Sequence, residues 1–347
     1  MREGKHKMFK KTLFFLCVMI LLTAAMLQAS YAGSLKLALN VKEINDLGND
    51  IYIDLGGDLS VCGNLTLDGS PVTDGLVAIQ IDDPQDGLFI LRTLTTGGTP
   101  QGPWSVEILE LITVNMAGDP ESDFKVGGYV GLKISIRNNG LSIRHVMVIV
   151  NLYYSDGLPF LAWKFYEEDM MPEDTETKTV HLPIPDDAHI GQAFVYASAI
   201  EDWPKNGGYA FSPEKSATFN IVGSGGSATY SSQGFHDMNG PGEYNLTFCT
   251  NGYGGLIGNY TVSAVSLYGF YFVTNQTTFE VYLLGDVNDD GKIRVNDVLA
   301  VASAFGTNEG GPGWDPRCDL THDGKVRVND VLIVALAFGK SCGNPPE

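Results

Sequence analysis

Oxygen-bearing side chains occur twice near the end of the chain, in the same twelve-residue order. Both copies have Asp at positions 1, 5 and 12, Asn or Thr at position 3, and Gly at position 6. Carboxylate and amide oxygens, with a main-chain carbonyl at position 7, form the oxygen cage that a hard cation such as Ca²⁺ requires. The sequence therefore predicts two bound calcium ions. The predicted ligands are Asp286, Asn288, Asp290, Lys292 and Asp297 in the first loop, and Asp319, Thr321, Asp323, Lys325 and Asp330 in the second, where each lysine contributes its main-chain carbonyl.

Each loop continues into a short apolar stretch that is predicted to be helical. The stretches Gly291–Gly306 and Gly324–Gly339 differ at only three positions. No helix-forming segment precedes either loop, and position 12 is Asp where the usual EF-hand has Glu. The aliphatic residue at position 8, Ile293 or Val326, is expected to let the two loops pair back to back. Since a chance loop would rarely recur with its following helix, we predict one small calcium-binding unit over residues 285–340.

This duplicated loop and helix closely resembles the dockerin domain, the type I-like module by which secreted proteins dock onto cohesin modules. The resemblance implies a cohesin-bearing partner, with contacts at positions 10 and 11 and along the helix that follows. These positions are Val295 and Asn296 in the first copy and Val328 and Asn329 in the second. Position 9 departs from the family pattern because it is Arg, and Thr321 is expected to weaken the second calcium site. A calcium-stabilised cap without a partner is the alternative interpretation.

The first 32 residues have the pattern of a secretory signal peptide. A basic stretch to Lys11 precedes an apolar run over 13–27, and Ser30-Tyr31-Ala32 is a small-x-small cleavage site. We expect cleavage after Ala32 and a secreted location, with any retention at the cell surface being non-covalent. An uncleaved anchor is the alternative, although the apolar run is shorter than the roughly 20 residues of a spanning helix. No second run of that length follows in the mature sequence.

Acidic residues outnumber basic ones, with 41 Asp and Glu against 22 Lys and Arg and a formal net charge of −19. Because the predicted signal peptide carries five basic residues and one acidic residue, its removal takes the charge to −23. Nucleic acid is an unsuitable partner for such a surface, since phosphate groups require patches of Lys and Arg.

Four cysteines follow the predicted cleavage site, an even number that favours disulfides outside the cell. Cys318 and Cys342 bracket the second calcium loop and its helix and are the candidate pair; the other two are Cys62 and Cys249. Four Asn-x-Ser/Thr tripeptides are candidate glycosylation sites, although such tripeptides also arise by chance. They begin at Asn64, Asn245, Asn259 and Asn275.

The middle of the chain predicts a mainly β fold, with tandem Ig-like β-sandwich modules followed by the small α-helical dockerin. Apolar residues alternate with period two in stretches such as 61–67 and 76–81, between turns rich in Gly, Pro and Asp. Residues 33–103 resemble carboxypeptidase-regulatory and other Ig-like surface folds. A first sandwich is therefore expected over 33–103.

Residues 104–223 resemble the CARDB domain, an adhesion-related Ig-like sandwich of prokaryotic surfaces, and the resemblance implies an archaeal surface protein. The resemblance rests on a strand that ends in the Asn-Asn-Gly140 turn, followed by a strand that ends in Leu152-Tyr-Tyr-Ser-Asp-Gly157. Residues 224–284 are predicted to form a linker and a short β module, either a truncated sandwich or a unit packed on the CARDB-like module. Residues 341–347 are predicted to be a tail.

Residues with catalytic potential are few. The run Glu167-Glu168-Asp169 supplies carboxylates of the kind that glycosidases use, but its neighbours Met170 and Pro172 indicate a solvated turn. The mature histidines lack metal-ligand spacing. Among the tryptophans, Trp203 on a predicted loop is the best candidate for an exposed sugar platform, and core packing is the alternative.

We therefore predict a non-catalytic secreted or cell-surface protein, in which the sandwiches act as spacers or bind a surface glycan or protein. The alternative is a carbohydrate-binding or hydrolytic component of a polysaccharide-degrading complex. The dockerin resemblance favours this alternative, because the family is best known from cellulose-degrading complexes. The resemblance does not establish that this chain catalyses a reaction.

Overall fold

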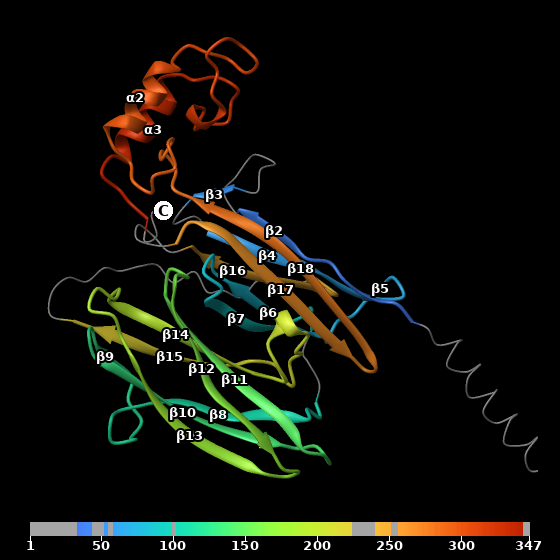
Figure 1. Ribbon diagram of the computed structural model, residues 1–347. Helices are drawn as coiled ribbons and strands as arrows, with labels where there is room; N and C mark the ends of the chain where they lie inside the picture. Colours follow the sequence, from blue (N-terminus) through green and yellow to red (C-terminus); the bar gives the residue numbers. More distant parts are fainter. Residues whose placement is uncertain are drawn as a thin grey trace, which may run out of the picture.

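The computed structural model describes residues 33–43, 52–54, 58–98, 102–223, 240–250 and 256–342. The predicted signal peptide lies outside these residues. Figure 1 shows two β-sandwiches, one above the other, and a small helical unit at the C-terminal end. The predicted fold class, mainly β with a small helical domain at the end, is confirmed. In the described part of the chain, no helix is long and apolar enough to cross a membrane.

The first sandwich consists of two five-stranded sheets. Its strands come from both ends of the chain. In several of them, buried residues alternate with more exposed ones, which directs one face of the sheet to the core. One sheet contains β1 (Leu35–Leu37), β2 (Asn40–Glu43), β4 (Asp58–Leu67), β5 (Ser70–Pro71) and β16 (Glu243–Cys249). The other has the order β3 (Tyr52–Asp54), β18 (Tyr271–Tyr282), β17 (Gly258–Tyr268), β6 (Leu76–Asp82) and β7 (Leu88–Thr95).

This strand pairing corrects the prediction of separate modules at 33–103 and 224–284. Antiparallel pairing joins β16 to β4 along its whole length, and β17 to β6. Phe248 of β16 and Leu59 of β4 are both completely buried in one core. The predicted short module therefore supplies strands without which neither sheet is complete. The sequence reasoning missed this because pairing between such distant segments leaves no local signal.

The second sandwich is inserted between β7 and β16 of the first. A three-stranded sheet packs on a five-stranded one, and the predicted CARDB-like region 104–223 matches these strands. The smaller sheet has the order β13 (Thr175–Pro183), β10 (Tyr129–Asn138) and β8 (Val106–Val114). The larger has β12 (Pro159–Met170), β11 (Arg144–Tyr154), β14 (Gly191–Ile200), β15 (Lys215–Val222) and β9 (Asp123–Lys125).

The two sandwiches contact each other through β11, which is buried on both faces. Val148 and its alternate neighbours face the core of the second sandwich, whereas Met147 and Ile149 pack against Ala78 and Leu91 of the first. The Asn151 amide reinforces this contact by bonding the main chain of Leu91, whose N–H donates to Asn151 Oδ1 at 3.0 Å. This interior strand of the inserted domain thus contributes side chains to two apolar clusters.

The helical unit contains α2 (Val295–Ser303) and α3 (Val328–Leu336), with a 3-10 turn, η2 (Pro316–Cys318), between them. Only three residues separate the end of β18 from the first calcium loop. Leu283 in this connection is 3% exposed and belongs to the same apolar cluster as the dockerin-like core residues Val287 and Val334. The helical unit is therefore packed on the first sandwich rather than tethered to it.

Candidate calcium centre

The first loop folds around the carboxylate of Asp286. Its Oδ2 accepts a hydrogen bond from the Gly291 N–H at 2.6 Å, and its Oδ1 accepts one from the Asp290 N–H at 3.1 Å. The Asn288 side-chain carbonyl also accepts from the Asp290 N–H, at 3.0 Å. A carboxylate has about four lone-pair positions, so these bonds orient Asp286 and leave acceptor capacity for a cation.

The carboxylate at position 12 connects the loop to the helix. Asp297 is completely buried, and its Oδ1 accepts from the N–H groups of Val287 and Asn288 at 3.0 and 3.2 Å. Its Oδ2 accepts from the Arg294 N–H at 2.8 Å, which caps the first turn of α2. Asp297, which is shorter than the Glu of the usual EF-hand, thus bonds the main chain at the start of the loop and also caps the N-terminus of α2.

The second loop repeats this arrangement with one difference. Asp319 Oδ2 accepts from the Gly324 N–H at 2.8 Å, and Asp330 Oδ2 accepts from the Arg327 N–H at 2.7 Å. However, the Thr321 hydroxyl is 3.0 Å from Asp330 Oδ1. In the first loop, Asn288 stands at this position, and the equivalent oxygen, Asp297 Oδ1, accepts from the main-chain N–H groups of Val287 and Asn288.

Sharp turns place the ligands within each loop. Asp289 and Gly291 have positive φ values of 58° and 74°, and His322 and Gly324 have values of 54° and 77° in the second loop. Glycine adopts this conformation without the steric cost of a side chain, which explains its presence at position 6 of both loops.

The donor set fits calcium, because each loop offers three carboxylates, a neutral oxygen and a main-chain carbonyl in the order that oxygen-cage sites use. Burial raises the pKa of Asp286, hydrogen bonds from Gly291 and Asp290 oppose the rise, and the nearby carboxylates of Asp297 and Asp290 add to it. Among the described residues, no three acidic, His or Cys side chains already converge as a preformed metal site. The carboxylates of Asp290 and Asp297 repel that of Asp286, and a cation bound between them would offset this repulsion.

Comparison with known families places this unit. The model of the dockerin type I domain matches residues 284–338. Residues 284–338 are a dockerin type I domain. The recognition made from the duplicated loop and helix is thereby confirmed. A search of curated proteins found no match for the chain.

The two repeats of the dockerin domain are related by a near two-fold rotation. The expectation that their loops pair back to back at Ile293 and Val326 is wrong, because the main chain of each pairs with another segment. Ile293 instead pairs with the segment after α3, donating to the Lys340 carbonyl at 2.9 Å. Val326 pairs in the same way with the segment after α2, donating to the Thr307 carbonyl at 3.1 Å. Both residues are completely buried. The segment that follows the helix of each repeat, here called the trailing segment, thus pairs with the loop of the other repeat.

The trailing segment also corrects the predicted boundary at residue 340. Cys342 is 7% exposed, and its N–H donates to the Gly291 carbonyl at 3.1 Å. The equivalent bond in the other repeat runs from the Glu309 N–H to the Gly324 carbonyl at 2.9 Å. The packed dockerin domain therefore extends to Cys342, and the rest of the predicted tail lies outside the described residues.

The four described cysteines are free thiols, so the predicted Cys318–Cys342 disulfide is absent from the structure. Cys342 Sγ lies 3.4 Å from the Gly291 carbonyl of the first loop, whereas Cys318 directly precedes the second loop. Both thiols are buried in the apolar core of the dockerin domain. Each therefore acts as a small apolar side chain.

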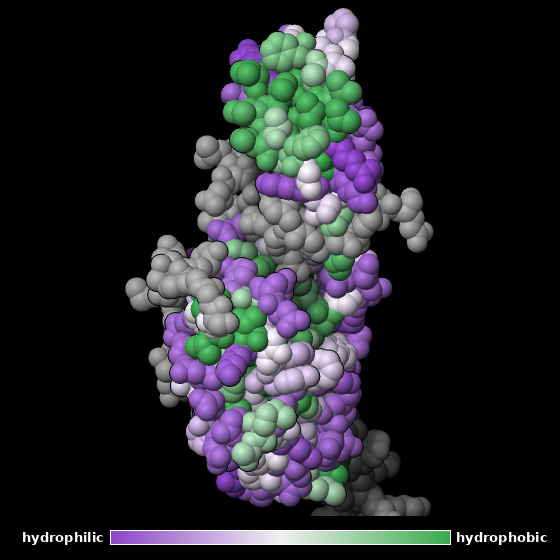
Figure 2. Space-filling model, turned by 90° about the vertical axis from the view of Figure 1, so that its left-hand side faces the viewer, coloured by the Kyte–Doolittle hydropathy of each residue, from purple (hydrophilic) through white to green (hydrophobic). Residues whose placement is uncertain are grey.

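The predicted partner-binding residues lie on the surface of both repeats. Asn296 and Asn329 are exposed, Val295 is 57% exposed and Val328 is 67% exposed. Further large apolar side chains are exposed beside them, and Figure 2 shows the resulting apolar surface over the dockerin domain. They are Leu299 and Phe305 from the first repeat, and Leu332, Leu336 and Phe338 from the second.

The alternating burial along each helix separates core from surface. Val301 and Val334 are completely buried, so these residues form the core of the dockerin domain. Phe305 and Phe338 are each 57% exposed, and their position at the helix ends leaves them outside that core. Helix periodicity alone could not separate these two groups, because it does not say which apolar residues a second helix covers.

The other candidate residues lie apart from the dockerin domain. Asn64 and Asn259 are exposed, whereas Asn245 and Asn275 are partly buried. The Asn275 Nδ2 donates to the Leu37 carbonyl at 2.9 Å, so this amide is engaged in the fold. Trp203 packs against the apolar cluster between the two sandwiches rather than forming an exposed platform.

Several solved structures have local likeness to this chain. A CARDB domain from Pyrococcus furiosus in complex with di-metal ions is 13% identical, with a TM-score of 0.24, and the match covers 35% of this chain and 94% of that one. A type II cohesin–X–dockerin complex from Acetivibrio cellulolyticus is 23% identical, with a TM-score of 0.16, over 29% of this chain and 70% of that one.

An alkylpurine DNA glycosylase, AlkC, from Pseudomonas fluorescens is 14% identical, with a TM-score of 0.27 and coverage of 35% of this chain. The chain spans 31% of that glycosylase's length. Scores this low assign no fold, so the architecture described above rests on the strand pairing of this chain.

Proposed function

We propose that this chain is a secreted, non-catalytic protein whose dockerin domain binds two calcium ions and docks onto a cohesin module. The two sandwiches then space or present a binding surface. The observation that carries this proposal is the apolar surface of the dockerin domain, which is exposed on both repeats at equivalent positions. Contiguous exposed apolar area on a folded domain marks an interaction site.

Calcium would supply charge neutralisation to the loops. Asp286, Asp290 and Asp297 would hold one ion with Asn288 and the Lys292 carbonyl, and the equivalent residues of the second loop would hold the other. Because the position-12 carboxylates also cap α2 and α3, an ion that fixes these carboxylates would also fix the helices that carry the apolar surface. Metal binding is thereby coupled to the docking surface.

Two features support a role without catalysis. The carboxylates of Glu167, Glu168 and Asp169 lie exposed along β12 rather than in a cleft. Asp169 and Glu168 also form ion pairs, with His145 at 2.9 Å and with Lys178 at 3.5 Å. Such paired surface carboxylates have ordinary structural roles.

Secretion is supported by the signal-like pattern of residues 1–32.

The near-identity of the two repeats supports two equivalent docking faces. Asn296 and Asn329 each lie in the first turn of a helix, beside an exposed valine. A rotation of about 180° that exchanges the repeats would therefore present nearly the same surface to a cohesin. With Ala302 and Ser303, and Ala335 and Leu336, at positions where type I dockerins often carry basic residues, the contact is expected to be apolar and weakly dependent on salt.

The test uses Asn296→Asp, Asn329→Asp and the double variant, measured by calorimetry against a panel of type I and type II cohesin modules. A carboxylate near a helix N-terminus does not destabilise the helix, so the variants should fold. Docking would desolvate the new charge on the face in use, so we expect each single change to weaken binding less than about threefold and the double change more than about a hundredfold.

Asn308→Asp is the matched control, because Asn308 is exposed and lies outside both helices. Its binding should equal that of the parent protein, and a chelator should abolish binding of every variant. If one single change abolished binding, only one face would be functional. If no cohesin of the panel bound in millimolar calcium, the docking proposal itself would fail.

A further inference from the structure

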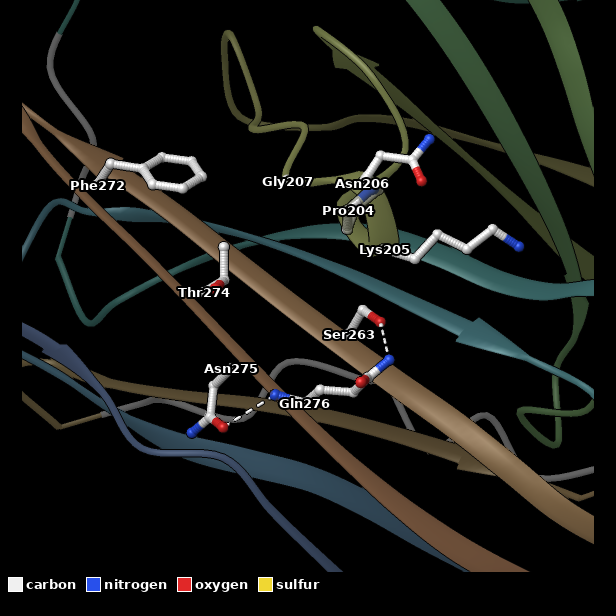
Figure 3. Close-up of a pocket in the computed structure, with 9 residues that line it drawn as sticks. All are labelled: Pro204, Lys205, Asn206, Gly207, Ser263, Phe272, Thr274, Asn275 and Gln276. Atoms are coloured by element: carbon white, nitrogen blue, oxygen red, sulfur yellow. Dashed lines mark hydrogen bonds between the residues drawn. The ribbon is translucent and has the colours of Figure 1, made fainter.

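A pocket of about 550 Å³ lies where the inserted sandwich meets the outer face of the first one. One wall is the loop that contains η1 (Pro204–Asn206), and the floor is formed by β17 and β18 (Figure 3). The volume falls within the range of roughly 300–1,000 Å³ that is typical of small-molecule sites. The loop is the segment whose tryptophan was the candidate sugar platform, although Trp203 itself faces the junction.

The loop wall is fixed in place. Within the loop, the Asn206 N–H donates to the Trp203 carbonyl at 2.8 Å, and the Gly207 N–H donates to the Pro204 carbonyl at 2.9 Å. The Lys205 N–H donates across the domain boundary to Gln80 Oε1 at 3.2 Å. A site whose walls are held by such bonds loses little conformational freedom when a ligand binds.

An aromatic ring stands at the rim. The Phe272 side chain is 52% exposed and projects from β18 toward Gly207 (Figure 3). Gly207 has a φ of 96°, and a Cβ atom there would lie 3.5 Å from Phe272 Cζ, so glycine keeps the space beside the ring open. One face of an exposed ring beside an open pocket can stack on the C–H groups of a flat ligand.

The floor carries neutral hydrogen-bonding groups. The Gln276 amide Nε2 donates to Ser263 Oγ at 3.2 Å, which orients the Gln276 side chain along the floor. In the described part of the chain, the Gln276 side-chain oxygen and the Thr274 hydroxyl have no protein partner. Both groups are exposed toward the pocket side of β18. They are therefore available to hydroxyl groups of a ligand.

Formal charge is balanced at this site. Lys205 is the one charged residue in the described lining, and its Nζ pairs with Asp82 Oδ2 at 3.3 Å. Figure 3 shows the Lys205 side chain directed away from Phe272 and Gln276. A charged ligand would thus find no unpaired counter-charge, whereas a neutral polyhydroxylated ligand would find both a ring and amide and hydroxyl partners.

We propose that this pocket binds a neutral saccharide unit, with Phe272 stacking on the sugar ring and Gln276 and Thr274 bonding its hydroxyl groups. The site requires both sandwiches, because the loop wall and the floor come from different domains. It is independent of the dockerin surface and does not depend on the docking function.

The experiment uses the full mature chain, residues 33–347, in calcium. A panel of neutral cello-, xylo-, manno- and malto-oligosaccharides is titrated by calorimetry and by ligand-observed NMR, with oligogalacturonate as the anionic comparison. At least one neutral oligosaccharide should bind, and Phe272→Ala should weaken binding roughly tenfold, as expected for loss of a stacked ring. Gln276→Ala should also weaken binding.

Phe270→Ala is the matched control, because Phe270 is fully exposed on the same β-hairpin but does not line the pocket. It should bind the sugar as the parent does, and both phenylalanine variants should retain cohesin binding and the same unfolding temperature. Equal binding by Phe272→Ala and the parent would overturn the proposal. So would a complete absence of binding across the neutral panel, or tighter binding of oligogalacturonate.

Discussion

At the scale of single residues, the interface between the two sandwiches depends on a buried charge. Arg92 on β7 donates to Glu214 of the inserted domain, with 2.5 Å between Arg92 Nη2 and Glu214 Oε1, and its guanidinium lies 3.4 Å from the centroid of the Tyr196 ring. Burial alone would lower the pKa of Arg92, but the Glu214 carboxylate outweighs burial and raises it. The arginine therefore stays charged inside the interface.

Removing the counter-charge should be costly. We expect Glu214→Ala to lower the free energy of unfolding by about 3 kcal/mol, because it leaves Arg92 buried without a partner. Glu110→Ala is the control, since Glu110 pairs with Lys133 on the surface at 3.8 Å, and its loss should cost under about 1 kcal/mol. Urea unfolding of both variants checks the difference, and equal losses would contradict a structural role for the buried pair.

The buried thiols of the dockerin domain lead to a second prediction. Burial raises the pKa of Cys318 to about 11, and the carboxylate of Asp315 adds to this effect. Since the thiolate is the reactive form, iodoacetamide at pH 8 should modify Cys318 slowly in calcium. Chelation should accelerate the reaction, because loops of repelling carboxylates lose their structure without the ion.

Mass spectrometry of the mature chain provides the readout. After unfolding without a reductant, all four cysteines should carry the label. Labels missing at Cys318 and Cys342 would instead establish the disulfide that the sequence suggested. Equal rates with and without calcium would argue against a calcium-dependent core.

Among the elements, each proposed calcium loop is joined to its helix by the carboxylate at position 12. The difference between the loops lies at position 3, where the Thr321 hydroxyl contacts the position-12 carboxylate and Asn288 offers an amide oxygen. An amide carbonyl is the stronger oxygen ligand for calcium in such a loop. The first loop should therefore bind calcium more tightly than the second.

Calorimetry should resolve two unequal sites, and Asp286→Ala should remove the tighter one. Thr321→Asn copies the first loop into the second and is expected to raise the affinity of the weaker site about threefold to tenfold. Thr218→Asn serves as the control for the substitution itself, because Thr218 is exposed on β15 of the inserted sandwich, away from both loops. Indistinguishable sites in the parent protein would refute the argument.

The elements that could be predicted from the sequence are those whose signals are local. Oxygen-bearing residues at fixed spacing around a glycine predicted both loops and the helices that follow. The resemblance to the dockerin family implied that Val295 and Val328 lie on the surface. The partners of β16 and β17 could not be predicted, because the period-two pattern says which face of a strand is buried but not which strand lies beside it. The pocket at Phe272 could not be predicted either, because its wall and its floor come from separate domains.

At the scale of the whole molecule, one sandwich interrupts the other. The chain leaves the first sandwich after β7 and returns to it at β16. Gly98 and Gly242, near the two crossing points, both approach the turn at Pro71–Thr73. The two crossing points of the first sandwich therefore lie close together, and the inserted domain has an apolar core of its own.

Fragments should show this asymmetry. Residues 102–223 alone are expected to fold, because both of their sheets are complete. Residues 33–103 alone should stay unfolded, since β4 and β6 lack β16 and β17 and leave Leu59 and Ile79 uncovered. Amide dispersion in two-dimensional NMR spectra distinguishes these outcomes. A folded 33–103 fragment would reinstate the independent first module.

The short connection between β18 and the dockerin domain would fix the orientation of the sandwiches in the proposed complex with a cohesin. Leu283 is buried within a core that spans both units, so the sandwiches follow the dockerin domain as one body. A domain joined to a dockerin by a flexible linker can adopt many orientations relative to it. In this chain, binding through the other dockerin face would rotate both sandwiches by about 180° relative to the cohesin. The complex would then hold the chain in one of two discrete orientations and in no intermediate one.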